Sequence, residues 1–297
     1  MPKPKPKSKI PVIQLQQKPS QNRIKPIVNK PLTLVTCWYT MKSKFPPQKY
    51  LNWIRNFVSI VKHFNLVIYT DSSSIHFFSF IKDMPQIQII IRPIEQFHTN
   101  KFEAQWLQNH NKSELPLHKV IDWHLNMLWN EKIFFVKDAI ERRIFDSAFY
   151  GWCDIGYFRN NPDDLHTDLL VNWAKNIETR LMPNIIHYGR VQNNDILFQK
   201  LESEIKSHYI YKLKTQPTNK YDEITYAGGF FIGTPSVLLQ YSKIYDEKLA
   251  YYFENGYLIK DDQLIVMDII TMNPRLFCIH TEAKKYNNWF MFQRVLL

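Results

Sequence analysis

A single carboxylate stands where a buried strand is expected to end. The apolar run that begins at Phe149 ends at Asp154, and Gly156 follows two residues later in the segment Trp152–Gly156. α/β proteins bind ligands at the carboxyl ends of strands, and a carboxylate in apolar surroundings needs a cation or hydrogen-bond donors beside it. Asp154 is therefore a candidate ligand-binding or metal-binding residue. The structural alternative is that Asp154 caps the turn that follows the strand.

Two more polar groups follow or open predicted elements, namely Asp261–Gln263 and His280 with Lys284 and Lys285. An imidazole and a carboxylate from separate strand ends can share a hard divalent cation such as Mn²⁺ or Mg²⁺, with phosphate oxygens in the remaining positions. Asp154 and His280 are the pair that this chemistry would use. Each group also has a structural alternative, because adjacent acidic residues favour a helix N-terminus and a histidine on an apolar strand is often a core residue.

Five of the seven glycines fall in two short segments. Gly151 and Gly156 flank Asp154, and the other three lie in Tyr226–Gly233. Glycine lets the backbone approach a ligand closely or adopt positive φ, so both segments are candidate binding loops. The chain has no G-x-G-x-x-G fingerprint and no Walker A lysine loop, which argues against a Rossmann dehydrogenase and a P-loop NTPase.

The hydrophobic pattern predicts the elements that carry these residues. Short apolar runs alternate with helical spacing of apolar residues, so the chain begins β-α-β-α-β and favours a parallel sheet covered by helices. The predicted strands are Leu32–Cys37, Leu66–Thr70, Ile87–Arg92, the run ending before Asp154, Ile185–Gly189 and Leu276–His280. The predicted helices are Tyr50–Phe64, Ile75–Lys82, most of Glu95–Arg143, a helix from Thr234 and Pro235 to about Asn255 with Gly256 as its stop, and one starting near Asp261.

The N-terminal 31 residues differ in composition from the rest. They hold seven Lys, one Arg, seven of the 17 prolines and no acidic residue, so they contribute eight of the eleven net positive charges. Frequent proline prevents a helix, and we expect residues 1–31 to be a disordered basic leader. Residues 32–297 are expected to form one α/β domain with a mostly parallel central sheet flanked by helices. The leader is a solubilising segment, a contact with nucleic acid or another anionic surface, or a targeting segment.

The sequence predicts a protein without a transmembrane segment. No apolar run approaches the length of about 18 residues that a membrane span needs, and the leader lacks the apolar stretch of a signal peptide. The three cysteines, Cys37, Cys153 and Cys278, lie in apolar strand-like runs without zinc-knuckle or C-x-x-C spacing. An odd number of strand cysteines favours a reducing compartment, so we expect a cytoplasmic location.

Several motifs occur in an order that resembles a known family. The motifs are Tyr-Thr-Asp ending at Asp71, Trp-x-x-Lys ending at Lys132, Trp-x-Asp-x-Gly around Asp154, Gly-Gly-Phe-Phe from Gly228, Asp-Asp-Gln at Asp261–Gln263, and the late His280. This order is similar to that of the HtrL/YibB-like proteins, GT-A-type glycosyltransferase relatives found in surface-polysaccharide gene clusters and in some large DNA viruses. The resemblance covers roughly residues 32–289.

The later motifs also resemble the retaining sugar transferases of the glycogenin and galactosyltransferase kind. In those enzymes a small-residue strand precedes the acceptor site, an Asp-Gln pair lies beside the donor sugar, and a late His followed by Lys and Trp closes on the metal and diphosphate. The chain departs from that group at Asp154, because it offers one carboxylate where their Asp-x-Asp motif offers two.

The resemblance implies one GT-A-like, Rossmann-like domain that moves a sugar from a nucleotide diphosphate sugar to a glycan or protein acceptor. It implies a UDP-sugar donor, Mn²⁺ or Mg²⁺ as cofactor, and retention at the anomeric carbon. The implied metal ligands are Asp154 and His280. Nucleotide and diphosphate contacts are implied for Thr36, Tyr39, Asp71, Lys132, Arg159, Gly228, Gly229, Lys284 and Lys285, and sugar or acceptor chemistry for Asp261, Asp262 and Gln263.

Two other functions stay open at this point. The missing second carboxylate permits a non-catalytic protein that binds sugar nucleotides or glycans on the same scaffold. Isolated carboxylates with a lysine, together with the basic leader, permit a metal-dependent nuclease. Against a nuclease, residues 32–297 carry only three of the eleven net charges and no concentrated basic stripe.

Overall fold

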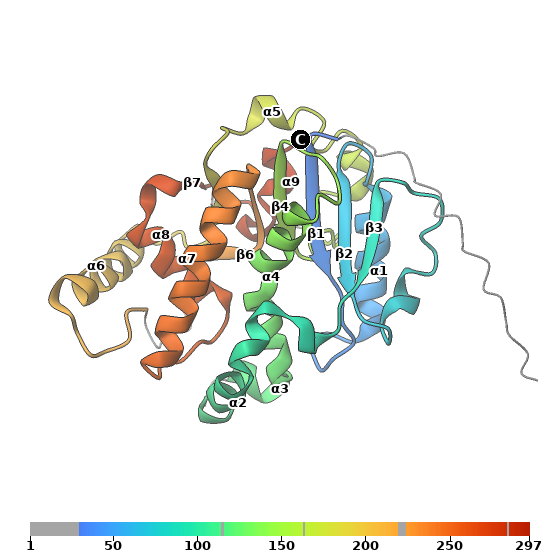
Figure 1. The fold of residues 1–297 in the computed structure, drawn as a ribbon. Coiled ribbons are helices and arrows are strands. Elements are labelled where there is room, and N and C mark those ends of the chain that lie inside the picture. The colour runs from blue at the N-terminus through green and yellow to red at the C-terminus, as the bar shows by residue number, and fades with distance from the viewer. Residues whose placement is uncertain (1–29, 114–115, 163, 219–223, 284) are drawn as a thin grey trace, which may run out of the picture.

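A seven-stranded mixed sheet runs through the computed structural model, which describes residues 30–113, 116–162, 164–218, 224–283 and 285–297 (Figure 1). The strands are β1 Leu32–Cys37, β2 Asn65–Thr70, β3 Ile87–Ile91, β4 Phe149–Cys153, β5 Ile186–Arg190, β6 Tyr226–Gly233 and β7 Phe277–His280, in the order β3-β2-β1-β4-β6-β5-β7. β6 is antiparallel to both of its neighbours, and the other four pairs are parallel. The predicted α/β class and mostly parallel sheet are confirmed, whereas the sequence did not predict the reversed direction of β6.

Helices cover both faces of the sheet. α4 and α7 lie in front of it in Figure 1 and share a hydrophobic core with α2, α6 and α8, while α1, α5 and α9 pack on the other face. The helix bounds are α1 Pro47–Ser59, α2 Glu103–Lys112, α3 Pro116–Val120, α4 Trp123–Glu141, α5 Ile177–Arg180, α6 Asp195–Tyr211, α7 Pro235–Glu254, α8 Asp262–Met272 and α9 Phe292–Val295.

Successive strand residues belong to different cores, as the pleat of a strand requires. In β1, Val35 and Cys37 pack in the core beneath α4, whereas Leu32 and Leu34 pack in the core beneath α1. The same alternation holds along β4, where Trp152 is in the α4 core and Cys153 in the α1 core. Residues of one hydrogen-bonded row therefore share a face, which fixes the side of the sheet on which each candidate residue lies.

The order of the strands reverses at β1. The chain passes through α1 to β2 and then β3 on one side of β1, and through α4 to β4 on the other side. In open α/β sheets, ligands bind in the crevice beyond the carboxyl ends of the strands at such a switch point. The segments that follow β1 and β4 are therefore the places where a ligand site is expected.

The predicted helix Tyr50–Phe64 is displaced towards the N-terminus. It begins at Pro47, which suits the first helical position because its missing N–H has no partner to lose there. The helix ends at Ser59, yet Ile60, Val61 and Phe64 stay buried because the turn before β2 continues to pack against the core. Burial without helical geometry explains why the apolar spacing ran past the end of the helix.

Two further elements differ from the prediction. The segment Ile75–Lys82, predicted as a helix, contains only the 3₁₀ turn Ile75–Phe78. The helix α6, Asp195–Tyr211, was not predicted, although Asn194 caps it by accepting a hydrogen bond from the Leu197 N–H at 3.1 Å. A capping residue is a local signal of the kind that sequence patterns can contain.

Residues 1–29 of the predicted leader lie outside the described residues. Its last two residues contact the sheet: the Lys30 carbonyl accepts from the Ser147 hydroxyl at 2.7 Å, and the Pro31 carbonyl accepts from the Phe149 N–H at 2.9 Å. Lys30 and Pro31 therefore belong with the folded part of the chain. Within the described ranges, no helix has both the length and the apolar composition that a membrane crossing requires.

Replacing Gly151 by alanine tests the packing between β4 and β6. An added Cβ would lie 3.1 Å from the Ile232 Cβ and closer still to the Phe231 carbonyl oxygen, which the sheet holds in place. We expect Gly151→Ala to lower the free energy of unfolding by about 3 kcal/mol, the upper end of typical overpacking costs. Urea denaturation measures this change.

Gly256→Ala is the matched control. Gly256 has a φ of 66° and no atom within 4 Å of an added Cβ, so only backbone strain of about 1 kcal/mol is expected. A loss at Gly151 no larger than the loss at Gly256 would contradict the packing described for β4 and β6.

Candidate functional site

An open cleft lies beyond the carboxyl ends of β1 and β4, at the switch point of the sheet. Counting the space open to solvent, it has a volume of about 800 Å³. Two kinds of side chain meet there, aromatic rings along the wall and charged groups at one end. The residues that line the cleft include Trp38, Lys44, Phe45, Tyr50, Trp53, Trp129, Lys132, Asp154 and Arg159.

The charged end of the cleft is built around Lys132 of α4. The Lys132 Nζ donates to Asp262 Oδ2 at 2.9 Å and to the Gly228 carbonyl at 2.8 Å, and it lies 3.4 Å from Asp154 Oδ1. The side chains of Lys132 and Asp262 are 8% and 10% exposed, whereas that of Asp154 is 42% exposed. Asp154 is therefore the carboxylate of this cluster that a ligand can reach.

Asp154 follows directly after β4. Its N–H donates to the Gly229 carbonyl at 2.8 Å, and its carbonyl accepts from the Tyr157 N–H at 2.9 Å, which closes the turn. The Asp154 carboxylate takes no part in that turn, because Oδ1 accepts from the Trp152 indole N–H at 2.6 Å. The turn is held by backbone atoms, and the side chain stays directed at Lys132 and the cleft.

A network of buried amides fixes the segment that enters α8. Asn109 of α2 exchanges two hydrogen bonds with the backbone of Ile259, at 2.7 and 2.8 Å, and Asn126 of α4 also donates to the Ile259 carbonyl at 2.9 Å. Asp261 then caps α8 by accepting from the Gln263 N–H at 3.1 Å. These bonds carry Asp262, the first residue of α8, to Lys132.

The structural alternative, that these acidic residues stand at a helix N-terminus, is therefore confirmed for Asp261. The three residues of the Asp-Asp-Gln motif have different structural roles. Asp261 caps the helix, Asp262 binds Lys132, and the Gln263 side chain donates to the Tyr226 carbonyl and so ties α8 to β6. Of the three, Asp262 has its carboxylate in the charged cluster.

Glycine at positions 228 and 229 makes room for the two carboxylates. A Cβ added to Gly228 would lie 2.7 Å from Asp262 Oδ2, and one added to Gly229 would lie 3.3 Å from Asp154 Oδ2. Both glycines are in β6, the strand next to β4. The Gly-Gly pair thus allows the backbone to approach two acidic side chains of the chain itself. The sequence analysis predicted a close approach at these glycines, but to a ligand.

Burial and charge act in opposite directions on Lys132. Burial lowers the pKa of an ammonium group, but the carboxylates of Asp154 and Asp262 outweigh it and leave the pKa of Lys132 raised. For Asp262, burial is the larger effect: it raises the pKa from its ordinary value of 3.8 to about 6, against the opposing influence of Lys132. The acidic neighbours Asp261 and Asp154 also act to raise the pKa of Asp262, and the value of about 6 includes their effect.

The aromatic wall comes mainly from the segment after β1 and from α1. Trp38 and Tyr50 lie with ring centroids 4.2 Å apart, and Phe45 packs edge-on against Trp53 at 5.3 Å. Trp38 and Trp53 are buried, whereas Phe45 and Tyr50 are partly exposed and offer apolar ring surface of the kind on which a nucleobase or a sugar ring stacks. The sequence analysis assigned Tyr50 and Trp53 to the buried face of a helix, because aromatic residues at helical spacing look the same whether they pack in a core or line a cleft. It gave no role to Trp38 or Phe45.

Two cations lie at the rim of the wall. The Arg159 guanidinium lies 4.6 Å from the Trp53 ring centroid and 5.1 Å from that of Phe290, and its Nε donates to the Gly156 carbonyl at 2.7 Å. Lys44 is exposed and holds its Nζ 4.9 Å from the centroid of Trp129. Arg159 was predicted as a phosphate contact, and the structure places it on the cleft. Lys44 was not predicted.

The structure does not bring His280 to Asp154. Asp154 reaches α4, on one face of the sheet, whereas His280 packs against Phe292 of α9, with ring centroids 5.1 Å apart, on the other face. β4 and β7 are also separated by β6 and β5, which corresponds to about 14 Å at ~4.8 Å per strand. The predicted pairing of these two residues failed because strand ends reveal neither strand order nor face.

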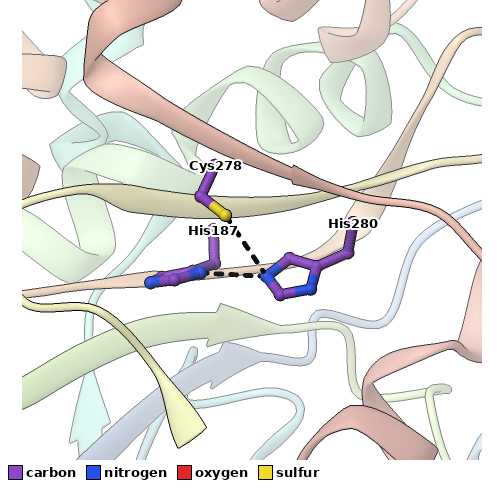
Figure 2. Close-up of side chains that lie close together, drawn as sticks. All are labelled: His187, Cys278 and His280. Atoms are coloured by element: carbon purple, nitrogen blue, oxygen red, sulfur yellow. Dashed lines mark hydrogen bonds between the residues drawn. The ribbon is translucent and has the colours of Figure 1, made fainter.

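His280 instead lies beside two residues that the sequence did not single out as ligands (Figure 2). Its Nε2 is 2.9 Å from the Nδ1 of His187, and 4.0 Å from the Sγ of Cys278. The donor atoms of all three residues lie within 4.8 Å of one another, so they can hold a metal ion. The three cysteines are free thiols, and Cys278 is the one that is not buried.

The remaining predicted nucleotide contacts fall in three different places. Tyr39 lines the cleft but is buried, and its hydroxyl donates to the Arg92 carbonyl at 2.8 Å. Thr36 is fully buried within β1, where strand alternation puts it on the face of Leu34, away from α4. Asp71 caps the turn after β2 by accepting from the Ser74 N–H at 2.8 Å.

Of the two predicted diphosphate lysines, only Lys285 belongs to the described part of the chain, and it is not among the residues that line the cleft. Lys284 lies outside the described residues. Lys285 is exposed, with its Nζ 4.9 Å from the ring centroid of Tyr286, and it lines a different hollow together with Pro162 and Arg294.

Comparison with known proteins adds no family assignment, since no protein-family model matches the chain and no curated protein matches it significantly.

Removing the Lys132 charge tests the charged cluster. Lys132→Met leaves Asp262 buried without its cation, and breaking a buried pair in this way costs about 3–5 kcal/mol. We expect a loss of that size in urea denaturation at pH 8 and a smaller loss at pH 5, where Asp262 can take up a proton. Lys200→Met, at a side chain that is 68% exposed, is the control and should change the stability little. An equal loss at both pH values would argue against a charged Asp262.

The raised pKa of Asp262 also predicts a pH dependence in the unaltered chain. Between its ordinary pKa of 3.8 and the folded value of about 6, the folded state holds a proton that the unfolded state has lost. Stability contributed by this proton is present below about pH 4 and is lost as the pH rises to about 6. Asp262→Asn should remove this part of the pH profile of unfolding, while Asp168→Asn, at a side chain 87% exposed, should leave it in place. Superimposable profiles for all three proteins would contradict the assignment.

Proposed function

We propose that the chain is a nucleotide-sugar-dependent glycosyltransferase with a GT-A-type domain. The observation that supports this most is the meeting of one accessible carboxylate, Asp154, with an aromatic cleft at the switch point of the sheet. The fold class and the position of Asp154 agree with the resemblance found in the sequence.

The proposal places the parts of the donor by their chemistry. The nucleobase stacks on the partly exposed ring of Phe45 or Tyr50, the diphosphate lies near Arg159 and Lys44, and the sugar faces Asp154. Arg159 suits a diphosphate because its guanidinium always carries charge and matches pairs of phosphate oxygens. Uridine is the base implied by the resemblance, so the proposed donor is a UDP-sugar.

In the proposed reaction, the bond between the anomeric carbon of the sugar and the β-phosphate oxygen breaks, and its electron pair leaves with the nucleotide diphosphate. Arg159 and Lys44 stabilise the charge that develops on that phosphate. The acceptor oxygen bonds to the anomeric carbon from the face that the nucleotide leaves, and its proton passes to the departing β-phosphate oxygen. The accessible carboxylate of Asp154 stabilises the positive charge that develops at the anomeric centre. A glycan or a protein hydroxyl can serve as acceptor, and we propose retention at the anomeric carbon.

The described residues do not form a Mn²⁺ or Mg²⁺ site at Asp154. A hard cation of this kind takes about six oxygen ligands. Asp154 supplies one carboxylate, the neighbouring carboxylate of Asp262 binds Lys132, and the Lys132 ammonium lies 3.4 Å from Asp154 Oδ1, where it already supplies positive charge. No step of the proposed reaction therefore uses a metal ion. The same arrangement disfavours the nuclease alternative, since the two carboxylates flank an ammonium group instead of an open metal position.

A second candidate function has a specific observation in its favour. Lys132 engages both carboxylates of the cluster, so Asp154 is an acid that is already partly paired. A protein that binds sugar nucleotides without turnover needs the aromatic cleft and its rim cations but no free carboxylate. Binding and turnover have to be measured separately for this reason.

The test measures binding and turnover of UDP-glucose and UDP-galactose by the full chain. We expect Asp154→Asn to reduce hydrolysis or transfer by at least about 100-fold with an unchanged circular dichroism spectrum, because it removes a group needed in the transition state. Tyr50→Leu should instead raise the Kd of the donor about 5- to 100-fold, the range of base-stacking energies. Asp168→Asn is the control for both measurements.

Three results would change the assignment. Binding without any turnover would favour the non-catalytic function, and the absence of both would overturn the proposal. Product analysis that shows an inverted anomeric carbon would remove retention but not transfer.

A further inference from the structure

A second group of side chains, on β5 and β7 and not among the residues that line the cleft, has the composition of a metal site. His187 of β5 and Cys278 and His280 of β7 point towards one another in Figure 2. β5 and β7 are parallel neighbours in which His187 pairs with Cys278 and Gly189 pairs with His280. Paired residues share a face of the sheet, so all three side chains emerge on one side from a rigid scaffold.

The hydrogen bonds of His187 leave its Nδ1 free for a cation. His187 Nε2 lies 2.9 Å from the Met182 carbonyl, which can only accept, so Nε2 carries the proton. In a neutral imidazole the other nitrogen, Nδ1, then offers a lone pair. A backbone carbonyl that fixes the tautomer and orientation of a histidine in this way is the usual outer partner of a metal-binding histidine.

The short distance between the two imidazoles requires a positive centre between them. His187 Nδ1 and His280 Nε2 are 2.9 Å apart, and two lone pairs at that distance repel. Because His187 Nδ1 carries no proton, the hydrogen between the rings is the one on His280 Nε2. A metal ion can take the place of that proton.

Two imidazole nitrogens and one thiolate select the metal. Mn²⁺ and Mg²⁺ prefer oxygen ligands, whereas Zn²⁺ binds nitrogen and sulfur in tetrahedral geometry. Zinc bond lengths of about 2.0–2.3 Å put the ligand atoms about 3.3–3.6 Å apart. The distance between the two imidazole nitrogens, 2.9 Å, is shorter than that range, and the distance from Cys278 Sγ to His280 Nε2, 4.0 Å, is longer. All three ligand atoms lie within 4.8 Å of one another, so shifts on the order of 1 Å would bring them to zinc-binding positions.

We propose that His187, Cys278 and His280 bind one Zn²⁺ ion, with the fourth position open. His280 and Cys278 are only partly buried, so water or another small ligand can fill that position. On binding, the Cys278 thiol releases its proton to solvent, and the proton of His280 moves from Nε2 to Nδ1, so that one proton leaves per ion. The site joins β7, the edge strand of the sheet, to β5 and does not involve the cleft.

Zn²⁺ alone, added to the purified full chain after treatment with a chelator, tests the site. We expect one equivalent of Zn²⁺ per chain, release of one proton, and a rise of several degrees in melting temperature from binding to the folded state. Co²⁺ in place of Zn²⁺ should give a thiolate-to-metal absorption band, which reports the Cys278 bond directly. Mn²⁺ and Mg²⁺ at the same concentration should cause no shift.

Two variants and one control decide between this site and adventitious binding. Cys278→Ser should abolish the thiolate band, and His280→Gln should lower the Zn²⁺ affinity at least tenfold, both with an unchanged circular dichroism spectrum. His166→Gln, at a side chain 56% exposed, should behave like the unaltered chain. Absence of Zn²⁺ binding at micromolar concentration, or equal binding and an unchanged cobalt band in both site variants, would overturn the proposal. Neither result bears on UDP-sugar binding, because none of the three residues lines the cleft.

Discussion

The buried ammonium group of Lys132 determines how four elements of the fold meet. Its Nζ, on α4, contacts a carboxylate after β4, a carbonyl of β6 and a carboxylate at the start of α8. A buried charge without partners costs several kcal/mol. Movement of α8 along α4 or away from β6 would separate Lys132 from Asp262, and this cost therefore opposes such movement. The amides of Asn109 and Asn126 hold the chain just before α8 from the outside. Stability and the shape of the candidate site therefore depend on the same few atoms.

Local patterns were enough to predict much of this arrangement. The apolar runs of β1 and β4, Pro235 at the start of α7, Gly256 after its end and Asp261 before α8 are signals that act within a few residues, and each of these predictions is confirmed. Local patterns could not predict the partners of Lys132, because Asp262 lies 130 residues away in the sequence. A lysine in an amphipathic helix carries no signal that distinguishes burial between two acids from exposure to water.

Strand order was the second quantity beyond the reach of local pattern. The polar residues at strand ends suggested that Asp154 and His280 converge, but convergence depends on which strands are neighbours and on the face that each side chain takes. The antiparallel β6 places Gly228 and Gly229 beside Asp154 and leaves β7 at the far edge. The two faces consequently carry different chemistry, with oxygen atoms and ammonium groups beneath α4 and nitrogen and sulfur atoms near α9.

One connection of the chain supplies most of the cleft wall. Between the end of β1 and the first half of α1, residues 38–53 contribute Trp38, Lys44, Phe45, Tyr50 and Trp53, whereas the charged cluster comes from α4, β4, β6 and α8. The aromatic wall and the charged cluster therefore come from separate stretches of sequence, which the proposed function uses mainly for binding and for reaction, respectively. An insertion or exchange within residues 38–53 can change which ligand fits while leaving the acid–ammonium cluster untouched, so relatives that share the cluster are free to diverge in what they bind.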